Sequence, residues 1–293
     1  MRVLVLTEDS SSRDGFEAEH GLSLYVEDGF RKFMIDVGAS GLFARNAQRF
    51  GVAVSEVDSL FLSHGHRDHV GGLPTFLELN RHAKIYSTES AFEPHFSLRK
   101  NGRFENIGFP ELPQSALAGR LVFNPGVLKV DGRLTLFSKV EIRELRSEAN
   151  DTLFTLKDPA SGMLTGDAAH YLPELFSRDT FAHEQNLAAI TETGKKVLFV
   201  GCAHCGVVNI VNRFIDIFGC APDVVVGGFH LMIPSRDETV SQVVLDKIAE
   251  RMAAWPTLFY TGHCTGRAAY ERLHDVLGER VVFFGAGASF DIR

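Results

Sequence analysis

Apolar and polar positions alternate along this chain with two periodicities, one typical of β-strands and one typical of α-helices. Runs that are apolar throughout, or that alternate with period two, predict strands because successive strand side chains point to opposite faces. These runs lie at residues 3–7, 21–27, 31–36, 60–62, 83–87, 134–137, 140–145, 152–156, 162–165, 186–191, 197–200, 222–227 and 257–261. Apolar residues at helical spacing predict helices. The helical stretches are 41–50, 73–80, 207–218 and 267–277.

One more helix is predicted from a capping box. Ser235 and Glu238 stand in an S-x-x-E pattern ahead of a stretch that continues to about Met252. In such a box the two side chains satisfy free backbone N–H groups of the first helical turn. Strands and helices alternate along the whole chain without a linker that would separate domains. The pattern therefore predicts one α/β domain over residues 1–293.

The periodicity fades between about residues 91 and 132. Aromatic and basic side chains gather there: Phe92, His95, Phe96, Arg99, Lys100, Arg103, Phe104 and Phe109. A long irregular segment inside a compact domain is uncommon unless it is functional or disordered. Two interpretations stay open, a lid over a substrate site and a cover with a structural role only.

Composition narrows the class of protein. With 45% hydrophobic and 23% charged residues, the 293-residue chain can bury a sizeable core and has no signature of disorder. Its net charge of −7 argues against nucleic acid as the main partner, since a phosphate backbone requires a basic surface. No apolar stretch approaches the length of a membrane span. Cysteines occur only at 202, 205, 220 and 264, too few for a disulfide framework, which predicts reduced thiols and a cytoplasmic protein.

Candidate metal ligands are concentrated directly after the predicted strand at 60–62. They are His64, His66, Asp68 and His69. Alternate side chains in a tight loop can point toward one place, so His64 and His66 would share a direction. Asp68 and His69 could reach a second point close by. Imidazole nitrogen and carboxylate oxygen suit borderline divalent metals. The cluster therefore predicts a site for one or two divalent cations, zinc first, with manganese or iron as alternatives.

The pattern H-x-H-x-D-H-x-G-G at 64–72 resembles the signature of the metallo-β-lactamase superfamily. Four more stretches resemble one of its subfamilies, named for a dihydropterin-ribofuranosylaminobenzene-phosphate synthase of methanopterin biosynthesis. They are residues 19–23, 201–206, 227–231 and 262–266. The resemblance implies a four-layer αββα sandwich with the metal site at one edge, between the two sheets.

The resemblance also implies where later ligands lie. In the superfamily a histidine precedes a strand, a turn and a second strand that ends in a bridging carboxylate. Asp167 imitates that last position, but no histidine stands in the right place before it. His183 fits better, because two predicted strands follow it and the second ends next to Cys202. Cys202 would then replace the usual aspartate as a thiolate ligand, in a two-metal, single-metal or redox-active site, with His204 as an alternative ligand.

The last predicted strand leads through a short loop into the helix at 267–277. Such a loop presents free backbone N–H groups and a partial positive charge. His263 is predicted to be the final metal ligand, since the superfamily's last histidine also closes such a strand. Cys264 and Thr265 would hold a substrate carboxylate or phosphate, or would only cap the helix.

Three residues are assigned supporting roles. Asp36 matches the superfamily's early aspartate, which orients a ligand or the loop around the metals through hydrogen bonds. His20 would face the substrate from a neighbouring strand, or serve only as a turn residue. His230 ends another strand and is predicted to be a catalytic proton donor, an outer ligand or a substrate contact.

Three functions follow from these residues. The first is hydrolysis of an ester, lactone, thioester or phosphoester-type small molecule by metal-activated water, with Asp68 orienting the nucleophile or passing a proton. The second, implied by the resemblance, is a dihydropterin-type transfer that releases pyrophosphate, with Phe104 and Phe109 stacking on a pterin. The third is a non-catalytic metal or redox sensor, which Cys202 and Cys205 favour. The expected partner is a small molecule, anionic or pterin-like, and a homo-oligomer is left open.

Overall fold

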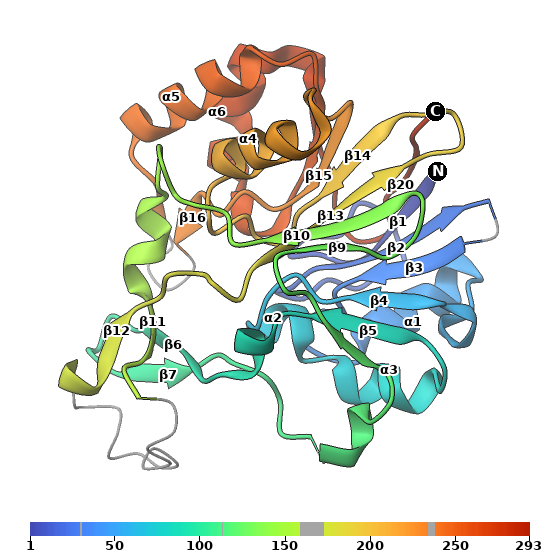
Figure 1. Cartoon of the computed structure of the whole chain (residues 1–293). Helices are drawn as coiled ribbons and strands as arrows, with labels where there is room; N and C mark the ends of the chain where they lie inside the picture. Colours follow the sequence, from blue (N-terminus) through green and yellow to red (C-terminus); the bar gives the residue numbers. More distant parts are fainter. Residues whose placement is uncertain (30, 113, 159–172, 234–237) are drawn as a thin grey trace.

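In the described part of the chain, two seven-stranded sheets pack face to face and helices cover the outer face of each (Figure 1). The structure is a computed structural model, and it describes residues 1–29, 31–112, 114–158, 173–233 and 238–293. The first sheet has the order β20-β1-β2-β3-β4-β5-β8. Its strands are β20 (Ser289–Asp291), β1 (Arg2–Thr7), β2 (Ser23–Asp28), β3 (Arg31–Ile35), β4 (Ser59–Phe61), β5 (Lys84–Ser87) and β8 (Leu121–Phe123).

The second sheet has the order β19-β18-β15-β14-β13-β10-β9. Its strands are β19 (Val281–Phe283), β18 (Leu258–Thr261), β15 (Val224–Gly227), β14 (Lys196–Phe199), β13 (Gln185–Ile190), β10 (Leu134–Ser138) and β9 (Val127–Lys129). A smaller four-stranded sheet stands beside the sandwich, made of β12 (Phe176–Arg178), β11 (Leu153–Leu156), β6 (His95–Leu98) and β7 (Phe104–Asn106). We call it the side sheet. The short strands β16 (Met232–Ile233) and β17 (Glu238–Thr239) pair with each other.

The helices complete a four-layer αββα sandwich, as the resemblance noted in the sequence implies. Helices α1 (Leu42–Phe50) and α3 (Leu73–Leu79) pack on the first sheet, and α2 (Arg67–Val70) is a single turn at the sandwich edge. Helices α4 (Val207–Phe218), α5 (Gln242–Ala253) and α6 (Arg267–Leu277) pack on the second sheet.

Strand β1 explains why the first strand is apolar at every position rather than alternating. Val3 and Val5 pack between the two sheets, in the core shared with the second sheet. Leu4 and Leu6 face the other way and pack under α1 and α3. A strand buried on both faces has no position that favours a polar residue. The continuous apolar run is therefore what a central layer requires.

The arrangement of the strands gathers many loops at one edge of the sandwich. Strands β3 and β4 are parallel in the first sheet, and β14, β15 and β18 are parallel in the second. Carboxyl ends of parallel strands share an edge, and ligands in α/β proteins bind outside that edge. The loops that follow β4, β14, β15 and β18 carry most of the histidines and cysteines singled out in the sequence.

Three predicted elements differ from the structure. Segment 91–132 is not irregular throughout: β6 and β7 enter the side sheet, β8 joins the first sheet and β9 joins the second. The described residues 140–145 include no strand. Their backbone N–H groups at Arg143 and Glu144 donate instead to the Asn209 side chain, each at 3.2 Å.

The predicted capping box is also wrong. Glu238 belongs to β17, and α5 begins only at Gln242. Ser235, the predicted strand at 162–165 and Asp167 lie outside the described residues. Within the described chain, none of the helices has the length and apolarity that a membrane crossing requires. All four cysteines are free.

Candidate metal centre

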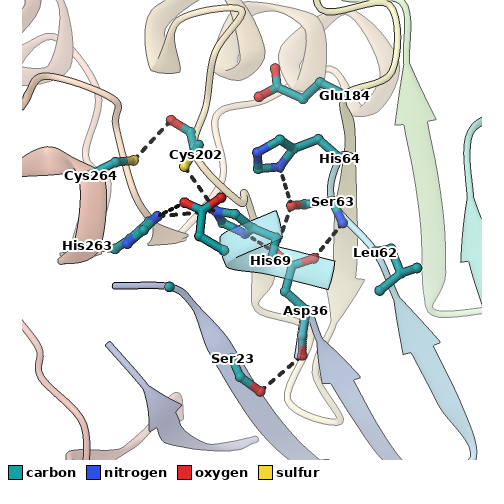
Figure 2. A network of polar contacts seen from close by, with 12 residues as sticks. Ser23, Asp36, Leu62, Ser63, His64, His69, Glu184, Cys202, His263 and Cys264 are labelled. Carbon is teal, nitrogen blue, oxygen red and sulfur yellow. Dashed lines mark hydrogen bonds and ion pairs between the residues drawn. The ribbon is translucent and has the colours of Figure 1, made fainter. Parts of the chain in front are cut away.

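One buried carboxylate, that of Asp36, holds the loop after β4 in place. Asp36 follows β3 and accepts the Ser63 backbone N–H on Oδ1 at 2.7 Å and the Ser63 hydroxyl on Oδ2, also at 2.7 Å. The same Oδ2 accepts the Nδ1–H of His69 at 2.6 Å. Figure 2 shows Asp36 between these two residues, with its own backbone oxygen bonded to Ser23. Asp36 therefore fixes the path of the loop and the orientation of one imidazole.

His64 and His204 face each other across the edge of the sandwich. Because the Ser63 hydroxyl donates to Asp36, its oxygen accepts the Nδ1–H of His64 at 2.8 Å. Asn150 donates its amide to the His204 carbonyl, which turns its Oδ1 toward the His204 Nδ1 at 3.3 Å. Both imidazoles thus carry their proton on Nδ1, and their bare Nε2 atoms lie 3.2 Å apart. Two lone pairs that meet in this way repel each other unless a cation lies between them.

His64, His66 and His204 form what we call the first cluster. Asp68, His69 and His263 form a second cluster beside it. His69 Nε2 lies 3.2 Å from His263 Nε2, and Asp68 Oδ2 lies 3.3 Å from the same His263 nitrogen. His263 is oriented by Asp9, whose Oδ1 lies 2.6 Å from its Nδ1. Burial alone would lower the pKa of His263, but the neighbouring carboxylates of Asp9 and Asp68 raise it well above its usual value. The protein field therefore favours positive charge at this point.

Cys202 lies between the two clusters. Its Sγ is 3.1 Å from His69 Nε2, and Figure 2 shows the side chain pointing at His69 and His263. Cys202 belongs to two groups whose donor atoms lie close enough together to hold a metal ion, one with Asp68, His69 and His263 and one with His204 and His230. Burial raises the pKa of its thiol well above the usual value. A thiolate at this position therefore requires a cation beside it.

Close packing of two loops brings Cys202 to this place. A Cβ on Gly201 would lie 2.0 Å from the Ser63 hydroxyl, so only glycine lets the loop after β14 touch the loop after β4. Backbone strain collects in the same region. Ala203, His230 and His263, like Asp36, have positive φ angles of 49° to 57°. Left-handed residues other than glycine cost free energy and cluster at functional sites.

Burial keeps the first cluster neutral. The pKa values of His64, His66 and His204 are lowered well below the usual value, first by burial and then by the neighbouring imidazoles or charges. Burial alone would raise the pKa of Asp68, but His69, His263 and His20 hold it well below its usual range. Neutral imidazoles and an ionised carboxylate are the forms that bind metals.

A pocket of about 380 Å³ opens over both clusters. Its floor contains His66, Asp68, Cys202, His204, His230 and Cys264. The side sheet supplies one wall, with Ser97 and Arg99 from β6 and its edge, Asn106 from β7 and Leu153 from β11. Arg67 and His20 stand at the rim, where both side chains are exposed. The buried donor groups are therefore accessible to a small molecule.

Known proteins resemble this chain over nearly its full length. The sequence model of the metallo-β-lactamase superfamily matches residues 17–142. The crystal structure of Tm1679, described as a metal-dependent hydrolase of the β-lactamase superfamily, has a TM-score of 0.79 at 24% identity and covers 100% of this chain and 99% of its own. In sequence the chain matches the metallo-β-lactamase superfamily over residues 17–142, and over its whole length it shares the fold of this β-lactamase-superfamily structure.

Two further relatives differ in what they are named for. The 7,8-dihydropterin-6-methyl-4-(β-D-ribofuranosyl)-aminobenzene-5′-phosphate synthase of Methanocaldococcus jannaschii is 27% identical over 305 residues, covering 94% of each chain. Zn²⁺-bound PqqB from Methylobacterium extorquens has a TM-score of 0.54 at 12% identity and covers 100% of both chains. The second likeness shows the fold alone.

The donor set fits a divalent metal ion, as the match to the metallo-β-lactamase superfamily implies. Bare imidazole nitrogens meet at 3.2 Å in the first cluster, and carboxylates stabilise positive charge in the second. His66 adds a buried Nε2 atom, and His230 two buried ring nitrogens, none with a hydrogen-bond partner within the described chain. Unpaired buried polar atoms of this number are rare in proteins unless an ion or water satisfies them.

Other residues predicted from the sequence also reach this centre. His20 bonds Asp9 at 2.7 Å, and its Nε2 lies 3.5 Å from Asp68 Oδ2. The His230 ring lies 4.1 Å from that of His204, between ring centroids. Cys264 lines the pocket, and its Sγ accepts the His230 backbone N–H at 3.2 Å.

Two predicted residues are placed differently. His183 accepts the Gly65 backbone N–H on Nδ1 at 3.1 Å and faces Asp179 with Nε2 at 3.1 Å. Both of its nitrogens are engaged, so His204 rather than His183 joins His64. Thr265 is fully buried, and its hydroxyl accepts the Phe229 N–H and bonds Thr261, so it does not reach the pocket.

Four contributors escaped the sequence analysis. Asp9 stands two residues after β1, much as Asp36 stands directly after β3, so the same strand-end rule could have found it. Glu184 is next to His183, and its buried carboxylate accepts the backbone N–H groups of His204 and Cys205 at 2.6 and 3.0 Å. His95 and Asp179 lie in segments without periodicity, and no signal in the sequence connects them.

Proposed function

We propose that this protein is a hydrolase of the metallo-β-lactamase superfamily that cleaves a small ester, lactone, thioester or phosphoester. The observation that carries the proposal is the meeting of bare nitrogens from His64 and His204, 3.2 Å apart, next to an accessible pocket that His204 lines. A structural metal site is normally closed by protein ligands, whereas a catalytic one keeps a position open to substrate.

Two groups of residues would hold the metals. His64, His66 and His204 form one, and Asp68, His69 and His263 form the other, with Cys202 between them. Bound divalent cations, with zinc as the first candidate, supply Lewis acidity and a water-derived nucleophile at neutral pH. Elemental analysis of the Zn²⁺-loaded protein gives the number of cations that each chain holds.

The chain's own residues then position the reactants. Asp68 stays ionised because its pKa is held low, so it accepts hydrogen bonds and orients the nucleophile rather than donating a proton. His230 has two ring nitrogens without partners among the described residues and stands at the pocket floor. It is the residue we assign to donate a proton to the leaving group.

The arginine side chains at the rim of the pocket favour an anionic substrate. Arg67 and Arg99 both line the opening, although the whole chain carries a net charge of −7. Arg99 is paired with Glu105 at 2.7 Å, whereas the Nε–H of Arg67 donates only weakly to the Gly108 carbonyl at 3.4 Å. Arginine at such a rim binds carboxylate or phosphate groups. The proposed partner is a small molecule, with no nucleic acid or membrane involved.

Transfer is the second candidate, and the relative from Methanocaldococcus jannaschii, named as a dihydropterin-related synthase, favours it. The aromatic residues expected to stack on a pterin do not support it. Phe104 is buried and stacks on Phe176 at 3.9 Å between centroids, inside the side sheet. Phe109 stacks on Phe92 at 4.2 Å. Both rings are thus already engaged with other protein rings.

One set of assays separates the candidates. The Zn²⁺-loaded protein is incubated with lactones, thioesters and phosphodiesters, with and without a chelator, and separately with a dihydropterin pyrophosphate and an aromatic acceptor. Turnover that a chelator abolishes and Zn²⁺ restores supports hydrolysis. Pyrophosphate release that depends on the acceptor supports transfer. Tight metal binding without turnover of any compound would contradict both and favour a sensor.

A further inference from the structure

A second buried layer of titratable side chains lies behind His66, away from the pocket. His95 begins β6, Asp179 directly follows β12, and His183 precedes β13. These three side chains are at most 2% exposed. One donor atom from each of them and one from His66 lie within 4.8 Å of one another. None of them except His66 lines the pocket.

The hydrogen bonds of this layer fix the tautomer of each imidazole. Asp179 Oδ1 accepts the Phe181 N–H at 2.7 Å, and Oδ2 faces His95 Nδ1 at 3.2 Å and His183 Nε2 at 3.1 Å. The carboxylate can only accept, so both histidines must donate to it. His95 therefore carries its proton on Nδ1, and its Nε2 is a bare acceptor.

That acceptor and a nitrogen of His66 both lack partners. Nε2 of His95 and Nε2 of His66 are buried and make no hydrogen bond with any described residue. The two ring centroids are 5.5 Å apart and the ring planes meet at 78°, an edge-to-face arrangement. Burying an unpaired acceptor beside an unpaired imidazole nitrogen is costly unless the two satisfy each other.

The loop between His64 and His66 is shaped for this approach. A Cβ on Gly65 would lie 2.8 Å from His95 Nε2 and 2.2 Å from the Ala91 carbonyl oxygen. Glycine at this position lets the His95 ring come against the loop. The Gly65 N–H also donates to His183, so the loop is held from behind at two points.

We propose that His95 and Asp179 are positioning residues for His66. In the metal-bound protein the Nε2–H of His66 would turn to donate to Nε2 of His95, whose Nδ1–H donates to Asp179. This leaves Nδ1 of His66 bare, and it joins the Nε2 atoms of His64 and His204 at the metal. The inference rests on the proposed metal centre and adds to it the two residues, His95 and Asp179, that orient His66 from behind. Partners of this kind orient metal-bound histidines and raise their basicity.

The same bonds argue against a separate metal in this layer. His183 accepts an amide proton on Nδ1 and donates from Nε2, so no lone pair remains on its ring. His95 has one bare nitrogen, and Asp179 already accepts three protons. The layer is complete as a set of hydrogen bonds once His66 donates to it.

The decisive measurement is the nitrogen NMR spectrum of the histidine rings in Zn²⁺-loaded protein labelled with ¹⁵N-histidine, with His66 assigned by a His66→Gln variant. We expect His66 to carry a proton on Nε2 and to bind Zn²⁺ through Nδ1. Zn²⁺ bound to Nε2 of His66 would overturn the inference while leaving the metal centre intact. A wild-type protein that binds no Zn²⁺ would overturn the proposed function as well.

Variants of His95 give an independent readout. His95→Phe removes the acceptor, and we expect Zn²⁺ affinity, measured by competition with a chelating dye, to fall about 10- to 100-fold. His95→Gln keeps an acceptor and a donor and should restore most of that loss. His82→Gln, at an exposed histidine, is the control and should bind like wild type.

Two results would contradict the inference. A folded His95→Phe protein that binds Zn²⁺ as tightly as wild type would remove the positioning role. Loss of one whole metal per chain, with the remainder bound normally, would mean that the layer itself holds a metal. If His95→Phe does not fold, the wild-type spectrum decides alone.

Discussion

Oδ2 of Asp36 lies 2.6 Å from Nδ1 of His69, and neither side chain is exposed to solvent. The same oxygen accepts the Ser63 hydroxyl, and that hydroxyl in turn accepts the Nδ1–H of His64. One carboxylate oxygen therefore sets the tautomers of two imidazoles that belong to different clusters. A substitution of Asp36 should therefore change the orientation of an imidazole in both clusters.

Asp36→Asn tests this directly. Asparagine tolerates the positive φ of residue 36, so the backbone should be unaffected. The amide, however, presents N–H groups where the carboxylate accepts three protons. We expect Zn²⁺ affinity to fall about 10- to 100-fold, measured by competition with a chelator. Asp14→Asn, at an exposed aspartate, should bind as wild type does. Equal affinity in both variants would show that Asp36 orients nothing.

Cys202→Ser should lower the metal content, because it replaces the sulfur between the clusters. Elemental analysis of the purified protein is expected to show a loss relative to wild type. The Co²⁺-loaded variant should lack thiolate-to-metal charge-transfer absorption. Cys205→Ser is the matched control, since Cys205 belongs to none of the candidate metal-binding groups of the described chain and does not line the pocket. An unchanged metal content and spectrum in Cys202→Ser would remove Cys202 from the site.

Gly65→Ala should destabilise the fold as well as the site. The added Cβ would lie 2.2 Å from the Ala91 carbonyl oxygen, a backbone atom that cannot move aside easily. We expect a loss of about 1–3 kcal/mol in the free energy of unfolding, measured by urea denaturation. At Gly132 an added Cβ meets no atom within 4 Å, so Gly132→Ala should change stability little. Equal stability of the two variants would contradict the close packing of His95 against the loop.

Arg67→Gln should change substrate binding more than chemistry. If Arg67 binds an anionic group at the pocket rim, KM for a phosphodiester should rise about two- to tenfold with little change in kcat. A neutral lactone should show no such rise. Arg143→Gln, which changes an exposed arginine outside the pocket lining, controls for the loss of charge. A rise in KM for the neutral lactone as well would argue for a general disturbance of the rim.

The fold was predictable wherever an element is long and clearly bounded. Helix α4 spans Val207–Phe218 in both prediction and structure, because a strong apolar face lies between Gly206 and Gly219. The side sheet was missed because β6, β7 and β12 are three or four residues long, too short to display a period. Residues 140–145 alternate like a strand, yet Val140 and Ile142 alternate because they pack toward the core around α4.

The candidate site was predictable where the candidate ligands come soon after a strand in the sequence. His64 to His69 stand together in the sequence, and His263 follows β18 as expected. The choice between His183 and His204 depended on the partners of each ring nitrogen. Those partners, Gly65 for His183 and Asn150 for His204, come from distant parts of the chain. His95 and Asp179 meet only through the pairing of the side sheet, which leaves no mark in either local sequence.

The contact between His69 and His263 joins a loop of the first sheet to a loop of the second. A cation held by both residues would act as a cross-link between the halves of the sandwich. Loading with metal should therefore slow hydrogen exchange at the backbone amides of β4 and β18 together, even though the two strands belong to different sheets. Loss of the metal would let each half open separately, so metal supply would also govern how well the folded chain resists proteolysis.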